Sequence, residues 1–233
     1  MWVCIYEIAL EDEGKKLVKL IRFASINGCF ILLLEVQGRL RTKLRSWIYC
    51  KIFHSRALEI GEHPYFRGTR YIKIGNNLCT GADLWMEAVV RYAGVTHNPQ
   101  IVIGDDVSMS DNVHITATTS VVLSDGVLVG SKVIITDHNH GMYSGEVQSD
   151  PGSRPSTRPL SHGRHVFIGR NVWIGDGVAI LPGSTIGDGS IIGANSVVNG
   201  YIPPACIAIG SPAHPVRIYD KGNKKWEKWV EVE

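Results

Sequence analysis

Two histidines stand close together in the segment ITDHNHG, which runs from Ile135 to Gly141. His140 opens a polar stretch, and Asp137 and Asn139 beside it could orient its ring. An imidazole held in this way can take a proton from a hydroxyl group near neutral pH. We therefore expect His140 to act as a general base. His138 either shapes the turn, contacts the substrate or serves as the second candidate for the base.

Other candidate binding residues lie at positions that should face outward. Side chains alternate along a strand, so the residue just before an inward aliphatic points away from the interior. His114 precedes Ile115, and Trp173 precedes Ile174. We expect His114 to contact substrate in a groove, although an ordinary exposed position is the alternative. An outward tryptophan is costly to leave in water, so Trp173 predicts a ligand or a partner subunit over it.

The element that must position these side chains is a six-residue repeat between Val166 and Pro203. A period of six matches neither a helix nor a lone strand, but it fits short strands that alternate with turns. Three such hexads would make one coil of about eighteen residues, and stacked coils make an all-β solenoid. The β-branched positions that should point inward are Ile168, Ile174, Ile180, Ile186, Ile192 and Val198.

The repeat continues towards the N-terminus with interruptions. It becomes readable near Tyr71, lapses from Val89 to Gln100, returns at Ile103 and gains two extra residues near Thr118. The segment from Gly141 to Gly163 is rich in Gly, Pro and Ser and has no period, so it predicts a long loop. A long loop that leaves a regular solenoid is more often functional than accidental.

The pattern divides the chain into three parts. Residues 67–218 are expected to form the solenoid with its loop 141–163, and residues 219–233 a short C-terminal tail, read as a helix. Residues 1–66 predict a helical segment, with apolar residues at helical spacing and basic residues between them. One interpretation is a cap whose apolar face packs on the first coil. The other is a peripheral membrane segment that contacts anionic headgroups. The apolar positions are Leu40, Leu44, Trp47, Ile48 and Ile52.

Composition narrows the function classes. A net charge of +2 argues against a dedicated nucleic-acid binder. The five cysteines show no CxxC spacing, which favours reduced thiols over a disulfide framework or a zinc site. Cys206 has no histidine partner nearby in the sequence, so we expect it to be structural. With no signal-peptide pattern and no long apolar span, we expect a cytoplasmic protein or one peripheral on the inner face of the membrane.

Two motifs resemble a known family. The segment IIGANSVVNGYIPPACIAIGSPAHPVRIY, starting at Ile191, and the motif NVWIG, starting at Asn171, resemble the C-terminal coils of the maltose, galactoside and nodulation acetyltransferases. DHNHG-Y followed by a loop and NVWIG is most similar to the subgroup that O-acetylates sugars of lipopolysaccharide and other surface polysaccharides. The resemblance covers about residues 70–218. It implies a left-handed parallel β-helix of hexapeptide repeats, acetyl-CoA as co-substrate, a carbohydrate acceptor, and homotrimers with sites between neighbouring solenoids.

The resemblance also implies roles for single residues. In the family a histidine at the end of the hexad before the loop is the general base, and counting hexads gives His140 that position. Trp173 matches the tryptophan that lines the active-site or coenzyme A groove, and Arg217 best matches a basic residue that meets the coenzyme A phosphates. Further positions of the coenzyme A pocket correspond to Gly175, Ala194 and Asn199.

The chain departs from the family pattern at two places near the C-terminus. Asn199-Gly200 replaces a common Thr-Lys pair, and His214 stands where an arginine is frequent. Either change could weaken the affinity for coenzyme A. On the acceptor side we expect Asp137, Asn139 and Tyr143 to contact the substrate.

The expected reaction is direct transfer, in which a sugar hydroxyl deprotonated by His140 attacks the thioester of acetyl-CoA and no acyl-enzyme forms. A small free sugar or a xenobiotic is the alternative acceptor. Two alternatives of another class are a non-catalytic scaffold and a metal hydratase similar to the γ-class carbonic anhydrases, with His114, His138 and His140 as ligands. That family's H-x4-H spacing is absent here, and we expect no metal.

Overall fold

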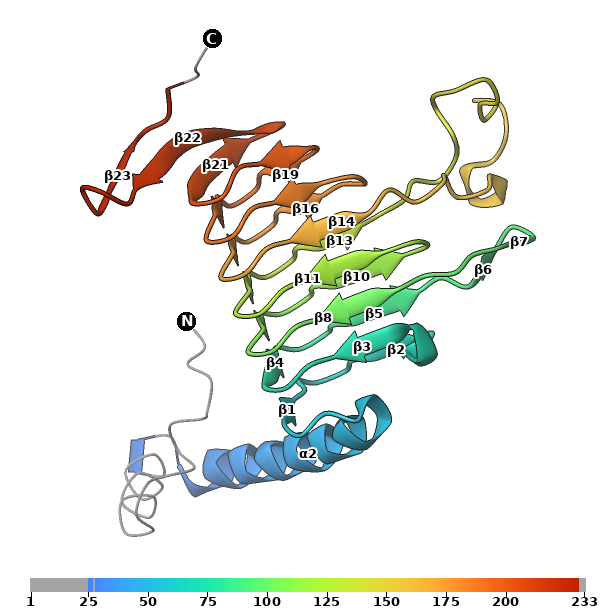
Figure 1. The fold of residues 1–233 in the computed structure, drawn as a ribbon. Coiled ribbons are helices and arrows are strands. Elements are labelled where there is room, and N and C mark those ends of the chain that lie inside the picture. The colour runs from blue at the N-terminus through green and yellow to red at the C-terminus, as the bar shows by residue number, and fades with distance from the viewer. Residues whose placement is uncertain (1–24, 27, 231–233) are drawn as a thin grey trace.

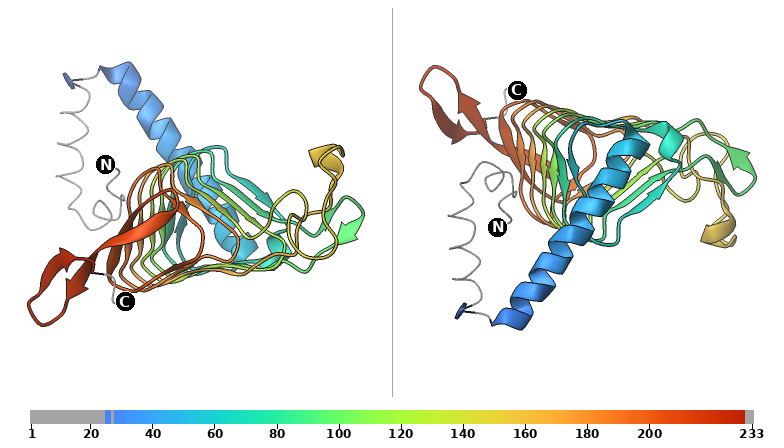
Figure 2. Two further views of the ribbon diagram at one scale, coloured as in Figure 1. Left: turned by 90° about the horizontal axis from the view of Figure 1, so that it is seen from above. Right: turned by 90° about the horizontal axis from the view of Figure 1, so that it is seen from below.

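The computed structural model describes residues 25–26 and 28–230. A long helix, α2 (Cys29–Phe53), is followed by short strands that wind through three parallel sheets (Figure 1). The coils stack on one another and their outline is a triangle when seen along the stack (Figure 2). The solenoid predicted from the hexads is therefore present, with one sheet on each side of the triangle.

Each sheet takes one strand from every coil. The first sheet contains β1 (Leu58–Glu59), β4 (Leu78–Thr80), β9 (Ser108–Met109), β12 (Leu128–Val129), β15 (Trp173–Ile174), β18 (Ile191–Ile192) and β21 (Cys206–Gly210). The second contains β2 (Tyr65–Arg67), β5 (Trp85–Ala88), β10 (His114–Ala117), β13 (Ile134–Thr136), β16 (Ala179–Ile180) and β19 (Val197–Val198). The third contains β3 (Ile72–Ile74), β8 (Ile101–Ile103), β11 (Val121–Leu123), β14 (Val166–Ile168), β17 (Thr185–Ile186) and β20 (Tyr201–Ile202).

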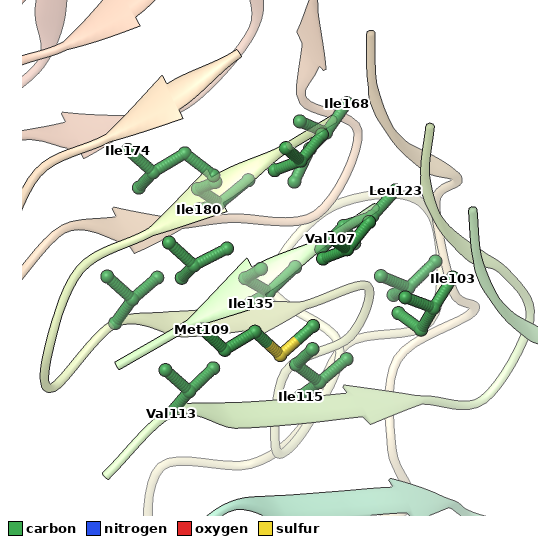
Figure 3. Packing of buried hydrophobic residues seen from close by; sticks show 14 of the residues in the cluster. Ile103, Val107, Met109, Val113, Ile115, Leu123, Ile135, Ile168, Ile174 and Ile180 are labelled. Carbon is green, nitrogen blue, oxygen red and sulfur yellow. The ribbon is translucent and has the colours of Figure 1, made fainter. Parts of the chain in front are cut away.

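The interior is a continuous column of aliphatic side chains. All six β-branched positions predicted to point inward, from Ile168 to Val198, have an exposed fraction of 0%. Side chains from the three sheets meet in the middle of the triangle, as Ile174, Ile180 and Ile168 of the first, second and third sheets do in Figure 3. The strand pairing shows the length of one coil. Ile174 pairs with Ile192, so this coil has eighteen residues, as predicted. In the earlier coils Met109 lies beside Val129, twenty positions on.

Glycine follows the inward aliphatic because the next coil needs that space. At one corner the Asp125 carboxylate accepts a hydrogen bond of 2.8 Å from the backbone N–H of Asp105 in the coil before it. At another, Asp176 accepts one of 2.7 Å from the N–H of Ser131. A Cβ on Gly104 or Gly130 would overlap the Asp125 or Asp176 carboxylate, respectively. Glycine thus allows each turn to be capped by the coil that follows it.

Two insertions leave the solenoid at the corner between the second and third sheets. The first, after β5, is a hairpin of β6 (Arg91–Tyr92) and β7 (Val95–Thr96), and it occupies the segment where the hexads lapse. The second is the loop 141–163, which follows β13. Figures 1 and 2 show both on the same side of the molecule.

The helix α2 covers the first coil, but not with the face that helical spacing predicted. Ser46 and Phe53 are buried, and the rings of Tyr49 and Phe53 both pack at a tilt against Phe66 of β2, at 4.9 and 5.1 Å between ring centroids. The backbone N–H of Ile60 donates to the Ser46 hydroxyl at 2.9 Å. The row predicted to pack inward is instead exposed, namely Leu40, Leu44, Trp47, Ile48 and Ile52. No helix among the described residues is long and apolar enough to cross a membrane.

The C-terminal end of the solenoid is an antiparallel ribbon. After β21 the chain reverses into β22 (Ala213–Asp220) and then β23 (Lys225–Lys228), both of which extend the first sheet. The expectation of a helix after residue 218 was therefore wrong. The turn between β22 and β23 is held by Asp220, which accepts hydrogen bonds from the Gly222 N–H at 2.7 Å and the Asn223 side chain at 2.6 Å.

Candidate active site

A buried carboxylate organises the corner beneath the loop 141–163. Asp137 follows β13 and is fully buried. Its Oδ1 accepts a hydrogen bond of 2.9 Å from the Thr118 N–H, and its Oδ2 accepts bonds of 2.7 Å from the N–H groups of both Thr119 and Ser120. Burial raises the pKa of Asp137, but hydrogen bonds from His138 and from the backbone of Thr118 and Thr119 outweigh it, so the pKa lies below its ordinary value. The group is therefore a carboxylate at neutral pH. Because Asp137 is fully buried, the expectation that it contacts the substrate was wrong.

His138 is oriented by that carboxylate. Its Nδ1 lies 2.7 Å from Oδ1 of Asp137, and its side chain is only 8% exposed. Because an ionised carboxylate can only accept, Nδ1 carries the proton and donates it to Asp137. The other ring nitrogen, Nε2, then presents a lone pair. A carboxylate on Nδ1 also stabilises the imidazolium that forms once Nε2 takes up a proton.

His140 is held by a different partner. It pairs with Leu160 across the base of the loop and is exposed. Its Nδ1 lies 3.3 Å from the hydroxyl of Tyr92 in β6, and that hydroxyl donates to the Ser156 carbonyl at 2.9 Å. Since the hydroxyl proton is committed to Ser156, Nδ1 of His140 donates to the Tyr92 oxygen and Nε2 is again the unprotonated nitrogen. Both histidines could therefore act as bases, but only His138 has a carboxylate behind it.

The base of the loop is a short backbone ladder. The Asn139 carbonyl accepts from the Ser161 N–H at 2.8 Å, and the Asn139 N–H donates to the Ser161 hydroxyl at 2.9 Å. The Arg164 N–H donates to the Asp137 carbonyl at 2.8 Å. Asn139 thus fixes the loop through its backbone and leaves its side chain exposed.

Tyr143 and Arg158 hold the loop above this ladder. The Tyr143 hydroxyl donates to the His140 carbonyl, and Arg158 donates to that hydroxyl at 3.0 Å and to the Ser153 carbonyl at 2.7 Å. The Tyr143 ring remains 58% exposed. These hydrogen bonds fix the loop beside His140. The exposed ring of Tyr143 could contact a substrate there.

His97 was not among the candidates that the sequence suggested. It follows the β6–β7 hairpin, and its Nε2 is buried with no hydrogen-bond partner among the described residues. Burial is the main cause that lowers the pKa of His97, and the neighbouring His138 and His162 lower it further while Asp137 raises it. His97 is therefore a neutral imidazole near the Asp137–His138 pair. An unpaired buried nitrogen is uncommon in folded proteins and often marks a functional position.

His114 lies on the outward face of the second sheet, as expected, in a row of rings. Its imidazole is 5.2 Å from Trp85, which is 4.5 Å from Tyr65 on the coil before. The register continues from His114 to Ile134, which lies at the start of the strand that leads to Asp137. Burial lowers the pKa of His114 although Glu87 raises it, so this ring is also neutral at pH 7. His114 is thus part of an outer row of rings on the sheet whose strand β13 leads to His138.

Trp173 lies on a different side of the triangle. It is in the first sheet, half exposed, between Leu128 and Ile191. On the following strands Ile191 pairs with Ile207, and Ile207 pairs with Arg217 in the C-terminal ribbon. Paired residues on neighbouring strands share a face, so Trp173 and Arg217 lie on one outer surface. The histidines are at the opposite corner, after the second sheet, and one chain does not bring them together with Trp173.

The other positions expected to bind coenzyme A are partly gathered. Gly175 and Ala194 lie on neighbouring coils at the end of the first sheet, so close that a Cβ on Gly175 would be 2.7 Å from the Ala194 backbone nitrogen. Asn199 lies at the next corner, after β19, and is exposed. The Arg217 guanidinium donates to the Trp226 carbonyl at 3.4 Å and is otherwise open to solvent.

Two further expectations can be compared with the geometry. Among the residues that the structure describes, no three His, Cys, Asp or Glu side chains come together as a metal site, so His114, His138 and His140 of one chain do not form one. Cys206 is fully buried, and burial raises the pKa of its thiol, which agrees with a structural role.

Similarity to known proteins agrees with this geometry. Residues 165–200 match the family described as bacterial transferase hexapeptide (six repeats). Over 188 residues the chain is 37% identical to WbbJ of Escherichia coli (strain K12), provisionally named a lipopolysaccharide biosynthesis O-acetyl transferase, covering 79% of this chain and 91% of WbbJ. The chain belongs to the hexapeptide-repeat acetyltransferases.

Two solved acyltransferase structures share the fold. A hexapeptide-repeat containing acetyltransferase of Vibrio cholerae superposes with a TM-score of 0.52 at 21% identity, covering 91% of this chain and 96% of that one. The N-acyltransferase AntD of Bacillus cereus, in a variant crystallised with dTDP-4-amino-4,6-dideoxyglucose and coenzyme A, superposes with a TM-score of 0.56 at 18% identity, covering 77% and 90%. At these identities the likeness concerns the fold, and the parallel coils of this acetyltransferase fit a left-handed β-helix.

Proposed function

We propose that this hexapeptide-repeat acetyltransferase transfers an acetyl group from acetyl-CoA to a sugar hydroxyl of a lipopolysaccharide or other surface-polysaccharide precursor. Membership of the family supports acetyl transfer. The name of the relative WbbJ supports O-acetylation in lipopolysaccharide biosynthesis. A small free sugar or a xenobiotic is the alternative acceptor.

The observation that carries the proposal is the Asp137–His138 hydrogen bond of 2.7 Å. A sugar hydroxyl is a poor nucleophile at neutral pH, so its attack on a thioester needs a base within hydrogen-bond reach. The buried carboxylate fixes the tautomer of His138 and leaves Nε2 free to act as that base. The hexad count favours His140, whereas the hydrogen bonds favour His138, and we propose His138.

In the proposed reaction Nε2 of His138 takes the hydroxyl proton while the sugar oxygen forms a bond to the thioester carbonyl carbon. The carbon–sulfur bond then breaks, coenzyme A leaves as a thiolate, and the His138 imidazolium returns the proton to it. Asp137 stabilises the imidazolium in between. No acyl-enzyme forms, so every atom of the acetyl group passes directly to the sugar.

The remaining residues have supporting roles in this proposal. His140 and Tyr143, on the ordered base of the loop, contact the acceptor, together with Asn139 and His114. The row from Trp173 to Arg217, with Gly175 and Ala194, receives acetyl-CoA. Asn199 follows the second sheet, as His138 does, and would contact acetyl-CoA from the corner of the histidines. Because that row and His138 lie on different sides of the triangle, a complete site needs two copies of the chain. This requirement supports the homotrimer expected from the family resemblance.

Matched His→Asn variants test the base. His138→Asn is expected to lower kcat about 100-fold or more, with acetyl-CoA affinity by calorimetry unchanged, because only proton transfer is lost. His140→Asn is expected to raise KM for the acceptor and lower kcat less. His54→Asn, at the exposed end of α2, serves as the control. If His138→Asn keeps most of its kcat, the assignment to His138 fails, and a loss confined to His140→Asn would transfer the role to that residue.

A second measurement tests the acceptor. Mass spectrometry of the cell's surface glycans, with and without this protein, should reveal acetyl groups that depend on it. Unchanged glycans, together with acetylation of a free sugar by the purified protein, would favour the alternative acceptor.

A further inference from the structure

The helix α2 carries more exposed large hydrophobic side chains than any other element that the structure describes. Among the side chains that the structure describes, α2 contacts the solenoid through its C-terminal half, with residues such as Ser46, Tyr49 and Phe53. The opposite face exposes Leu40 by 62%, Leu44 by 62% and Trp47 by 59%. A contiguous apolar patch of this kind is unusual on a protein that stays in water and marks a surface that another phase or molecule covers.

The exposed residues form a continuous row. Leu33, Leu40, Leu44 and Trp47 follow one another at spacings of seven, four and three, which places them along one side of the helix. The N-terminal half projects beyond the triangular outline of the coils (Figure 2). There Phe30 is 72% exposed and Leu33 is 66% exposed. The row therefore extends from the part of α2 that lies over the first coil to the part that projects beyond the coils.

Basic side chains accompany this row. Arg39, Arg41, Lys43 and Lys51 are exposed, whereas Glu35 is the one acidic residue of the helix. Arg39 lies 4.0 Å from Glu35. Within the described part of the chain, no acidic side chain pairs with any of the other three. An exposed helix with an apolar row and unpaired cations is complementary to a surface that is apolar inside and anionic outside.

The charges on α2 distinguish between three possible arrangements, which are pairing with a second copy, a helix that spans a bilayer, and a helix that lies on its surface. A second copy of the same face would bring like charges together, which opposes pairing. A helix that crossed a bilayer would place Arg39, Arg41 and Lys43 in its hydrocarbon core, where charged side chains are costly. A helix lying in the headgroup region buries the leucines and leaves the cations at the phosphates.

We propose that α2 docks this acetyltransferase in the plane of an anionic phospholipid bilayer through the face that contains Leu40, Leu44 and Trp47. The helix runs across the end of the coil stack (Figures 1 and 2), so a docked helix would set the stack upright on the bilayer. The acceptor would then be presented on a lipid carrier at the membrane surface. The docking itself does not depend on the proposed function, because it involves neither acetyl-CoA nor a sugar.

Vesicle sedimentation of the full chain tests the charge contribution. We expect binding to vesicles of phosphatidylcholine with phosphatidylglycerol, and little binding to phosphatidylcholine alone. One basic side chain near an anionic surface contributes about fivefold in affinity, so R41Q/K43Q/K51Q should weaken binding about 100-fold. The control K221Q/K224Q/K225Q removes the same charge from the exposed turn of the C-terminal ribbon and should bind within about twofold of the parent. Absence of parent binding, or equal loss in both triple variants, would overturn the proposal.

A second pair of variants tests the apolar row. L40S/L44S should weaken vesicle binding about tenfold or more, because two leucine side chains that would enter the apolar part of the bilayer are replaced by polar ones. The control V147S, on the loop 141–163, removes an apolar side chain that is 72% exposed and should change nothing. Light scattering over a range of protein concentrations gives the oligomeric state of each variant. If L40S/L44S changes that state and leaves vesicle binding intact, the face belongs to a contact between copies and the proposal is wrong. Acetyl transfer, measured separately on a soluble acceptor, should be the same in all of these variants.

Discussion

Asp137→Asn is the most informative single change at the candidate site. In the native chain Oδ1 faces Thr118 and His138, and Oδ2 faces the N–H groups of Thr119 and Ser120. An amide keeps one acceptor oxygen and replaces the other by NH2, which can only donate. At the Oδ2 position the amide nitrogen would face the N–H groups of Thr119 and Ser120, and at the Oδ1 position it would face the N–H and the hydroxyl of Thr118 together with Nδ1 of His138. In either orientation at least two groups that donate in the native chain lose their acceptor.

The magnitude follows from that count. A buried donor that loses its acceptor costs about 1–3 kcal/mol, so two such losses predict a decrease of about 2–6 kcal/mol in the free energy of unfolding. If the amide nitrogen faces His138, the imidazole must also adopt the other tautomer, with its lone pair on Nδ1. A base that presents the wrong nitrogen loses its catalytic contribution, so kcat is expected to fall about 100- to 10,000-fold.

Acid denaturation separates the carboxylate from its neighbours. The pKa of Asp137 is lowered in the folded protein, so its contribution to stability is present above the unfolded pKa and is lost as the pH falls through the folded pKa. The parent should thus lose stability progressively below about pH 4, whereas Asp137→Asn should lack that component. Unfolding in denaturant at several pH values, together with kcat in the stable range, measures both effects.

Asp125→Asn is the matched control, because Asp125 caps a corner through a single backbone N–H and is exposed. It should cost about 1 kcal/mol and leave kcat unchanged. The reasoning would be refuted if Asp137→Asn unfolded like Asp125→Asn and kept the parent's kcat.

Three further outcomes follow from the core, the outer row and the hairpin corner. Ile180→Ala should lower the free energy of unfolding by about 2–5 kcal/mol, measured in denaturant, because its side chain is fully buried between coils. Arg217→Gln should weaken acetyl-CoA binding about tenfold in calorimetry without changing kcat, and unchanged affinity would remove Arg217 from the binding row. His97→Leu should flatten the pH dependence of stability near pH 6. The folded pKa of His97 is lowered, so the unfolded chain binds more protons there and the parent loses stability as the pH falls below about 6.5.

The solenoid was predictable because its signal is local and repeated. Each inward aliphatic side chain contacts the equivalent side chain one coil away. Aliphatic residues that recur at a fixed spacing in the sequence therefore identify side chains that stack in the core. The places where the repeat is interrupted could also have located the candidate active site. The interruption at 89–100, the extra residues near Thr118 and the loop 141–163 all follow strands of the second sheet. Insertions at one register position stack at one corner, and that is how Tyr92 and His97 reach the histidines.

Other features depend on contacts that no spacing reveals. The choice between His138 and His140 depends on the Asp137 carboxylate and the Tyr92 hydroxyl, and Tyr92 is remote in the sequence from both histidines. The face of α2 was misjudged because helical spacing identifies an apolar row but not what covers it. The side of α2 that packs on the first coil consists of Tyr49, Phe53 and Ser46, which accepts a hydrogen bond from the Ile60 N–H. In the tail, the turn residues Asp220 to Asn223 were the available signal for a hairpin.

The two ends of the coil stack have a consequence for how the protein avoids polymerising. A stack of parallel strands is open at both ends, and each end offers unpaired N–H and C=O groups on which another molecule could add its own coil. Here α2 lies over the first coil, and at the far end the first sheet turns antiparallel through β22 and β23, which no parallel coil can follow in register. The helix at one end and the ribbon at the other therefore hinder a second molecule from adding its own coil to the first sheet, whatever else their surfaces bind.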